Sequence, residues 1–230
     1  MRLLKSVLVP VHPQGWPFVG LFALAAAVLW YVALPLGLVG CVLTLWCVYF
    51  FRNPDRTTPT RPGLVISPAD GVVQMITSVP PPDQLDMGQD GLVRVSIFMN
   101  VFDVHVNRVP VDGVVDKVFY YPGRFVNASL DKASEHNERQ CVAVRTADGR
   151  RVAFVQIAGL IARRILCNLQ PGQSVRAGER FGMIRFGSRV DVFLPAGVQA
   201  MVAVGQRAVA GETVIADMNS SEPQRAGEVR

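Results

Sequence analysis

The chain has 230 residues, of which 50% are hydrophobic, and its mean hydropathy is +0.29. These values are high for a wholly water-soluble domain, so part of the chain is expected to meet lipid. The formal net charge of +5 is carried mainly by arginine, which favours anionic lipid headgroups. No basic run with interleaved aromatic residues is present, so nucleic acid is not expected as a partner. The four cysteines form no CxxC pair and no histidine lies at metal-ligand spacing, which predicts reduced thiols and no metal site.

An apolar stretch near the N-terminus, residues 18–51, contains 34 residues without a formal charge. A straight helix of this length would span about 51 Å, against about 30 Å for the hydrocarbon core of a bilayer. Pro35 and Gly37 lie at the midpoint of the stretch, where they are typical of a helix break. The sequence therefore predicts a hairpin of two helices with 16 to 17 residues each.

Basic residues lie on both sides of this stretch, Arg2 and Lys5 before it and Arg52 and Arg56 after it. This places both ends of the hairpin on the cytoplasmic side of the cell membrane, with the rest of the chain. Two alternatives remain. A cleaved signal peptide would have a shorter apolar stretch and a small-residue cleavage site, and a re-entrant hairpin would dip into the bilayer without crossing it.

A proline- and arginine-rich connector, residues 52–63, follows the apolar stretch and cannot continue a helix. It predicts a domain boundary, with a membrane-anchoring segment at residues 1–51 and a second domain at residues 52–230. Runs of strand type fill the second domain: Val72–Val79, Leu92–Met99, Val114–Tyr121, Cys141–Arg145, Val152–Ile157, Met183–Phe186, Val190–Leu194 and Val198–Val204. The predicted fold is mainly β, a β-barrel or sandwich preceded by an N-terminal hydrophobic helical hairpin.

Local signals add detail to this domain. Asp148 and Gly149 predict a hairpin turn, residues 123–140 predict a loop, and the polar tail after Asp217 predicts disorder. The segment Gly172–Glu179 recurs as Gly205–Glu212 and predicts two related turns. Similar glycine-rich turns occur in biotinyl and lipoyl carrier domains, although those carriers need a lysine on an exposed hairpin.

The dipeptide Gly187-Ser188 would by itself indicate only a turn. Its surroundings, F-G-S-R-V-D-V-F-L-P at residues 186–195, resemble the processing site of the short-form phosphatidylserine decarboxylases. Three more segments resemble the same family: S-P-A-D-G at residues 67–71, F-M-N-V-F-D-V-H-V-N-R-V-P at residues 98–110, and D-K-A-S-E-H-N-E-R at residues 131–139. Together with the apolar hairpin and R-N-P at residues 52–54, the resemblance covers nearly the whole chain.

This resemblance implies a proenzyme that cuts itself between Gly187 and Ser188, giving a β chain of residues 1–187 and an α chain of residues 188–230. The Ser188 hydroxyl would attack the preceding carbonyl and leave an ester in the backbone. Elimination to dehydroalanine and hydrolysis would then release ammonia and leave a covalent pyruvoyl group at position 188. Glycine at 187 has no Cβ to crowd this attack.

The implied activity is decarboxylation of phosphatidylserine to phosphatidylethanolamine, a step of phospholipid biosynthesis. The pyruvoyl ketone would form a Schiff base with the serine amine and hold the electrons released as carbon dioxide leaves. The implied partners are the lipid substrate, the membrane, and a heterodimer of the protein's own two chains. Two alternatives stay open: a decarboxylase of a related serine-headgroup lipid, and a non-enzymatic, membrane-tethered β domain of carrier type.

The same resemblance gives His105 the role of acid and base, with Asp70 as its partner. From the residues alone, His105 could be a structural histidine and Asp70 a turn aspartate. Longer family members have a second histidine where this chain has Arg108, which cannot act as a base and could instead bind the substrate phosphate or carboxylate.

Four further polar residues say less about function. We interpret His136 and His12 as surface residues, and Glu138 with Arg139 as a pair that orders a loop, with substrate contact as the weaker alternative.

Overall fold

The computed structural model describes residues 9–123, 137–159, 164–185 and 188–229. The chain forms two compact units, Met1–Asp55 and Arg56–Arg230.

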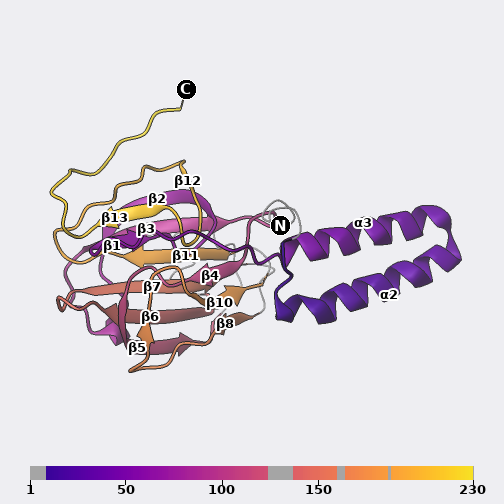
Figure 1. Cartoon of the computed structure of the whole chain (residues 1–230), viewed down its shortest axis with the longest axis horizontal. Helices are drawn as coiled ribbons and strands as arrows, with labels where there is room; N and C mark the ends of the chain where they lie inside the picture. Colours follow the sequence, from indigo (N-terminus) through magenta and orange to yellow (C-terminus); the bar gives the residue numbers. More distant parts are fainter. Residues whose placement is uncertain (1–8, 124–136, 160–163, 186–187, 230) are drawn as a thin grey trace. The chain divides into compact units, whose positions relative to one another are not determined.

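The first unit is a helical hairpin (Figure 1). A short 3₁₀ turn, η1 (Pro13–Gly15), precedes α2 (Trp16–Val32), and α3 (Leu34–Phe50) runs back alongside it. Ala33 separates the helices in an extended conformation. Pro35 lies in the first turn of α3, where its missing N–H costs no hydrogen bond. The predicted pair is confirmed, and each helix has 17 residues.

Small residues let the two helices pack closely. A Cβ added at Gly40 would lie 2.6 Å from the Cα of Ala26, so only glycine fits there. Large apolar side chains face outward instead, and Tyr31 is 94% exposed. Residues 13–32 are long and apolar enough to cross a membrane, whereas α3 is shorter. The outward apolar surface of the hairpin is therefore suited to lipid rather than water.

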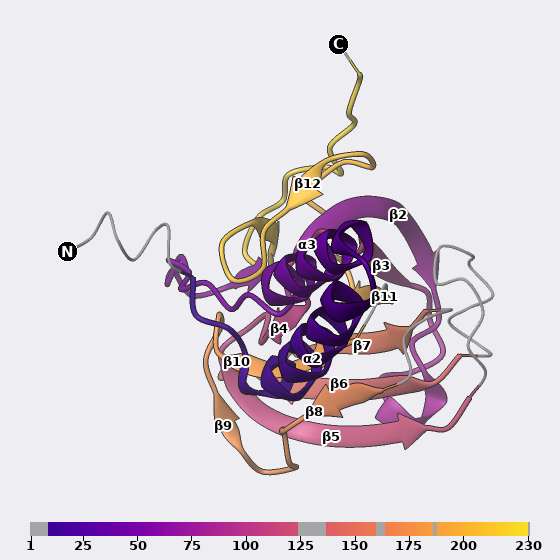
Figure 2. The same cartoon turned by 90° about the vertical axis from the view of Figure 1, so that its right-hand side faces the viewer.

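The second unit is mainly β, as predicted. Its largest part is an antiparallel sheet of eight strands, which curls as Figure 2 shows. The strand order is β12 (Arg207–Ala208), β2 (Gly71–Val79), β3 (Leu92–Met99), β11 (Ser188–Phe193), β7 (Arg151–Ala158), β6 (Arg139–Arg145), β5 (Gly113–Tyr121) and β9 (Ser174–Val175). A three-stranded sheet contains β4 (Val106–Arg108), β10 (Arg180–Ile184) and β8 (Ile165–Cys167), and β1 (Leu64–Ile66) pairs with β13 (Val214–Asp217). A 3₁₀ turn, η2 (Asp83–Leu85), lies between β2 and β3.

The eight-stranded sheet has an inner and an outer face, because side chains alternate along each strand. On β11, Val190 and Val192 belong to the main core, whereas Phe193 belongs to a smaller cluster on the outer face. The three-stranded sheet covers the inner face, and its Phe181 packs edge-on against Phe154 of β7. Ser188 has the same parity as Val190 and so faces the space between the two sheets.

The predicted repeat forms two equivalent edge strands. The N–H of Gly172 donates to Val115 O, and the N–H of Gly205 donates in the same way to Val73 O, each at 2.8 Å. The glycines have φ of +84° and +92°, a conformation that disfavours other residues. The resulting strands, β9 and β12, lie at the two ends of the large sheet.

Most of the predicted strands are confirmed within two residues, as is the turn at Gly149 between β6 and β7. The run Met183–Phe186 corresponds to β10, which begins earlier at Arg180, and Phe186 lies outside the described residues. The strand predicted at Val198–Val204 is wrong. This segment forms turns with a single bridge, Ala200 to Ala216, and its Val198, Ala200 and Val202 side chains fill the core without joining a sheet, whereas Val204 is exposed.

Candidate active site

Ser188 is the first residue of β11, in the middle of the large sheet. It pairs with Met99 of β3 on one side and Ala158 of β7 on the other. The residue is fully buried, and its Oγ has no hydrogen-bond partner among the described residues. Gly187, the predicted other side of the cleavage site, lies outside the described residues. A buried hydroxyl without a partner is costly, which makes Ser188 a candidate for chemistry.

His105 lies at the same end of this unit. Its main-chain oxygen accepts from the N–H of Ile184, the last residue of β10, 3.4 Å away. Only Arg185 and the two residues after it separate Ile184 from Ser188 along the chain. The structure therefore brings the predicted histidine and serine to one region between the two sheets.

The hydrogen bonds of His105 define its chemistry. Its ring is fully buried, and Nδ1 lies 3.0 Å from the main-chain oxygen of Asp103. A carbonyl can only accept, so Nδ1 carries the proton and Nε2 is the basic nitrogen of the neutral ring. Asp103 is held by the N–H of Asn100 and by an ion pair with Arg207. The turn after β3 thus fixes the orientation of the imidazole.

Two amide side chains that the sequence motifs did not single out connect the sheets beside this site. Gln156 of β7 donates from Nε2 to Asn107 Oδ1 at 2.9 Å and to Leu166 O at 3.3 Å. Asn107 lies on β4, two residues after His105, and its Nδ2 contacts the sulfur of Met99. The resemblance segment contains Asn107, but only the strand pairing shows which way it points.

Asp70 lies in the turn before β2. Its carboxylate accepts from Arg56 at 2.7 Å and from the N–H of Ala210 at 2.8 Å. The preceding Pro68 O accepts from the N–H of Arg108, which places this turn beside β4 and the histidine segment. The role of Asp70 as partner of His105 stays a prediction.

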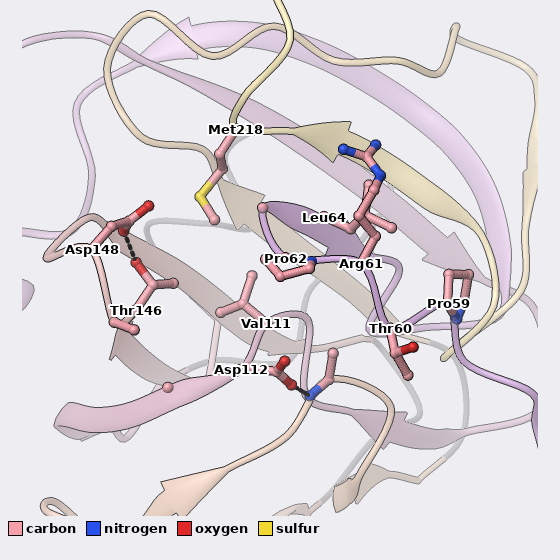
Figure 3. A pocket seen from close by; sticks show the side chains of 14 residues that line it. Pro59, Thr60, Arg61, Pro62, Leu64, Val111, Asp112, Thr146, Asp148 and Met218 are labelled. Atoms are coloured by element: carbon pink, nitrogen blue, oxygen red, sulfur yellow. Dashed lines mark hydrogen bonds between the residues drawn. The ribbon is translucent and has the colours of Figure 1, made fainter.

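Asp112 is the counterpart of Asp70 in a second internal repeat, which was not predicted. The pattern P-x-D-G-V-V occurs at residues 68–73 and again at residues 110–115. Asp112 accepts from the N–H of Ala177 at 2.7 Å, and Ala177 matches Ala210 in the repeated turns. Figure 3 shows Asp112 on the wall of a pocket of about 340 Å³. Neither Ser188 nor His105 lines that pocket.

Arg108 projects from the face of β4 opposite to Asn107. Its Nη1 donates to Gly178 O at 2.7 Å, and its side chain packs beside Gly211. Both glycines belong to the repeated turns, so this contact helps to hold them. Binding of substrate by Arg108 stays a prediction.

Other charged groups surround the site. Burial, and then the charge of Arg164, lower the pKa of Arg185, which follows β10. Glu138 and Arg139 do not form the expected pair: the Arg139 guanidinium stacks on Tyr121 at 4.1 Å, whereas Glu138 Oε1 accepts from Ile165 N.

His136 lies outside the described residues. Among the residues that are described, no group of three His, Cys, Asp or Glu side chains is arranged to hold a metal ion.

Comparison with known proteins gives a consistent result. The family model for phosphatidylserine decarboxylase matches residues 43–216. A relative from Paramagnetospirillum magneticum, named phosphatidylserine decarboxylase proenzyme, is 61% identical over 230 residues, which cover 100% of this chain and 96% of the relative. Relatives with the same name from Cereibacter sphaeroides and Nitrobacter winogradskyi are 55% and 53% identical, covering 99% and 96% of this chain and 98% and 90% of their own lengths. The chain belongs to the phosphatidylserine decarboxylase family.

Proposed function

We propose that the protein decarboxylates phosphatidylserine to phosphatidylethanolamine after cutting itself between Gly187 and Ser188. The observation that carries this proposal is the buried, unpartnered Oγ of Ser188 at the start of a central strand, with His105 at the same end of the unit. The family membership supports the substrate, and the relatives' name of proenzyme supports the cleavage.

The residues present fit a pyruvoyl group at position 188. In the uncut chain, the Ser188 hydroxyl has no competing hydrogen bond among the described residues and can attack the preceding carbonyl. Nε2 of His105 is the nitrogen that would take the hydroxyl proton, because Nδ1 is already committed to Asp103. When formed, the pyruvoyl group supplies a ketone that condenses with the substrate amine and withdraws electrons as carbon dioxide leaves.

The two structural units support a division of roles. We assign membrane anchoring to the hairpin, because its outward surface is apolar, and catalysis to the β unit, which contains Ser188 and His105. Basic residues on both flanks of the hairpin favour a cytoplasmic β unit. Residues 1–187 would form the β chain, and residues 188–230 the α chain.

Intact-mass spectrometry of the purified protein tests this proposal. We expect two chains that meet at Gly187 and Ser188, the smaller with pyruvoyl in place of serine, and release of carbon dioxide from phosphatidylserine. Ser188→Ala should stay a single chain of 25.1 kDa without activity. A single unmodified wild-type chain would favour the carrier-type alternative, and an active Ser188→Ala variant would exclude the mechanism.

A further inference from the structure

A row of three residues crosses the inner face of the large sheet at the Ser188 end. Ser188 pairs with Ala158, and the N–H of Ala158 donates to Glu138 O at 2.9 Å. Glu138 has the same parity as Val142 of the main core, so its side chain emerges on the same face as Ser188. Neighbouring strands lie about 4.8 Å apart. Only the methyl group of Ala158 therefore stands between the two side chains in this row.

Glu138 is a buried carboxylate, with 8% of the residue exposed. Its Oε1 accepts from the N–H of Ile165 at 3.4 Å, and its charge and hydrogen bond contribute, after burial, to raising the pKa of Tyr120. Within the described part of the chain, no lysine or arginine forms an ion pair with it. A buried negative charge without a cation is unfavourable, so the site is suited to a positively charged ligand group.

Gln156 adds a neutral acceptor beside this carboxylate. Its Nε2 donates to Leu166 O, which can only accept, so the orientation of the amide is fixed. Its Oε1 is left without a partner among the described residues, although the side chain is fully buried. A water shared with Nε2 of Gln140, which lies opposite on β6, would satisfy this oxygen. Such a water would leave the charge of Glu138 uncompensated.

We propose that Glu138 and Gln156 form the subsite for the primary amine of the lipid substrate. The ammonium group is the only cationic part of a phosphatidylserine headgroup, and it must come close to position 188. Over Ala158 it would lie between Ser188 and the Glu138 carboxylate, with Gln156 Oε1 as acceptor of a second N–H. This inference rests on the proposed function, because that function defines the amine.

Glu138→Gln tests the subsite, because the amide keeps an acceptor for Ile165 N and removes only the charge. The exposed Glu179→Gln is the matched control. Calorimetry on the self-cleaved protein would compare dihexanoyl phosphatidylethanolamine with dihexanoyl phosphatidylethanol, which lacks the amine. We expect Glu138→Gln to weaken binding of the amine ligand by about tenfold or more and to leave the amine-free ligand unchanged. Glu179→Gln should change neither affinity.

A second variant tests the other half of the subsite, with self-cleavage as the check that it folds. Gln156→Met keeps the side-chain volume but removes the acceptor together with the hydrogen bonds to Asn107 and Leu166, and a chain that still cleaves itself should again show weaker binding of the amine ligand only. The inference would be overturned if Glu138→Gln or Gln156→Met still cleaves itself but binds both ligands more weakly by the same factor, or binds both as tightly as the wild type does. Carbon dioxide release by the wild-type chain tests the proposed function separately. If the wild-type chain releases no carbon dioxide from phosphatidylserine, the proposed function is wrong. The comparison of the two ligands still tests the amine subsite in that case.

Discussion

At the scale of single residues, the buried Ser188 hydroxyl is a source of instability. Leaving a buried hydroxyl without a partner costs on the order of 1–3 kcal/mol, so a chemical role explains its presence better than a structural one. Cys141 is the contrasting case. It is also fully buried, but burial raises the pKa of its thiol to about 12, so it stays protonated near neutral pH and is a poor nucleophile.

His105→Asn tests the histidine at this scale. The asparagine side chain can keep the hydrogen bond to Asp103 O, but it offers no base in place of Nε2. We expect self-cleavage to slow by about 10²–10⁴-fold, measured by gel electrophoresis of newly synthesised chain over time. Cleavage at the wild-type rate would remove His105 from the mechanism.

The sequence predicted part of the candidate site and missed the rest for a physical reason. Ser188 and His105 lie in recognisable motifs. Glu138 was interpreted as a partner of Arg139, but neighbouring residues on a strand point to opposite faces. The place of Glu138 beside Ser188 depends on the pairing of β11, β7 and β6, which no local spacing reveals.

At the scale of elements, the two repeated turns provide an internal control. Asp70 and Asp112 each accept from the N–H of an alanine in one of the two glycine-rich repeated turns, Ala210 and Ala177, at 2.8 and 2.7 Å. The Asp70 turn accepts a hydrogen bond from β4 through Pro68 O, whereas the Asp112 turn follows β4 along the chain. If Asp70 and Asp112 have only the same structural role, the same substitution at each should have the same effect. If Asp70 has a further role, its substitution should have an additional effect.

Asp70→Asn and Asp112→Asn should be compared side by side. We expect both to lower the free energy of unfolding by about 1 kcal/mol, because each weakens a charge-assisted hydrogen bond to a main-chain N–H. Asp70→Asn alone should also slow self-cleavage by at least tenfold, and mass spectrometry of the chain over time would measure this rate. Equal cleavage in the two variants would mean that Asp70 only holds its turn.

The elements themselves were predictable where they are long. Strands β2, β3, β5, β6 and β7 have seven to nine residues, and a sustained apolar pattern marks each. Strands β4 and β8 have three residues each, which is too short for a pattern. Val198–Val204 shows the opposite error, because Val198, Ala200 and Val202 are buried by packing rather than by strand pairing. Hydrophobic pattern reports burial, and pairing depends on distant segments.

At the scale of the whole molecule, the α-chain side of the proposed cut belongs to the centre of the main sheet, because Ser188 is the first residue of β11. The α chain would contribute β11, bonded to β3 and β7, as well as β12 against β2 and β13 against β1. These contacts should hold the two chains together after the peptide bond is broken.

Refolding experiments test this arrangement. We expect the cleaved protein to migrate as one species in mild detergent and to separate into two chains in guanidinium chloride. After dilution of the denaturant, the uncleaved Ser188→Ala chain should regain its β-sheet circular dichroism, whereas the cleaved pair should recover less than about a tenth of it. Equal recovery by both would show that the α chain can find its place unaided.

Because β11 lies in the centre of the sheet, the cleaved protein should depend on folding that took place before cleavage. A continuous chain brings this strand between β3 and β7 at a cost set by loop closure, but a separate 43-residue fragment would have to find the same gap by diffusion. The cleaved, active protein would therefore keep a fold that only the uncleaved precursor could form. Damage that unfolds it could not be repaired by refolding, and each lost molecule would have to be replaced by new synthesis.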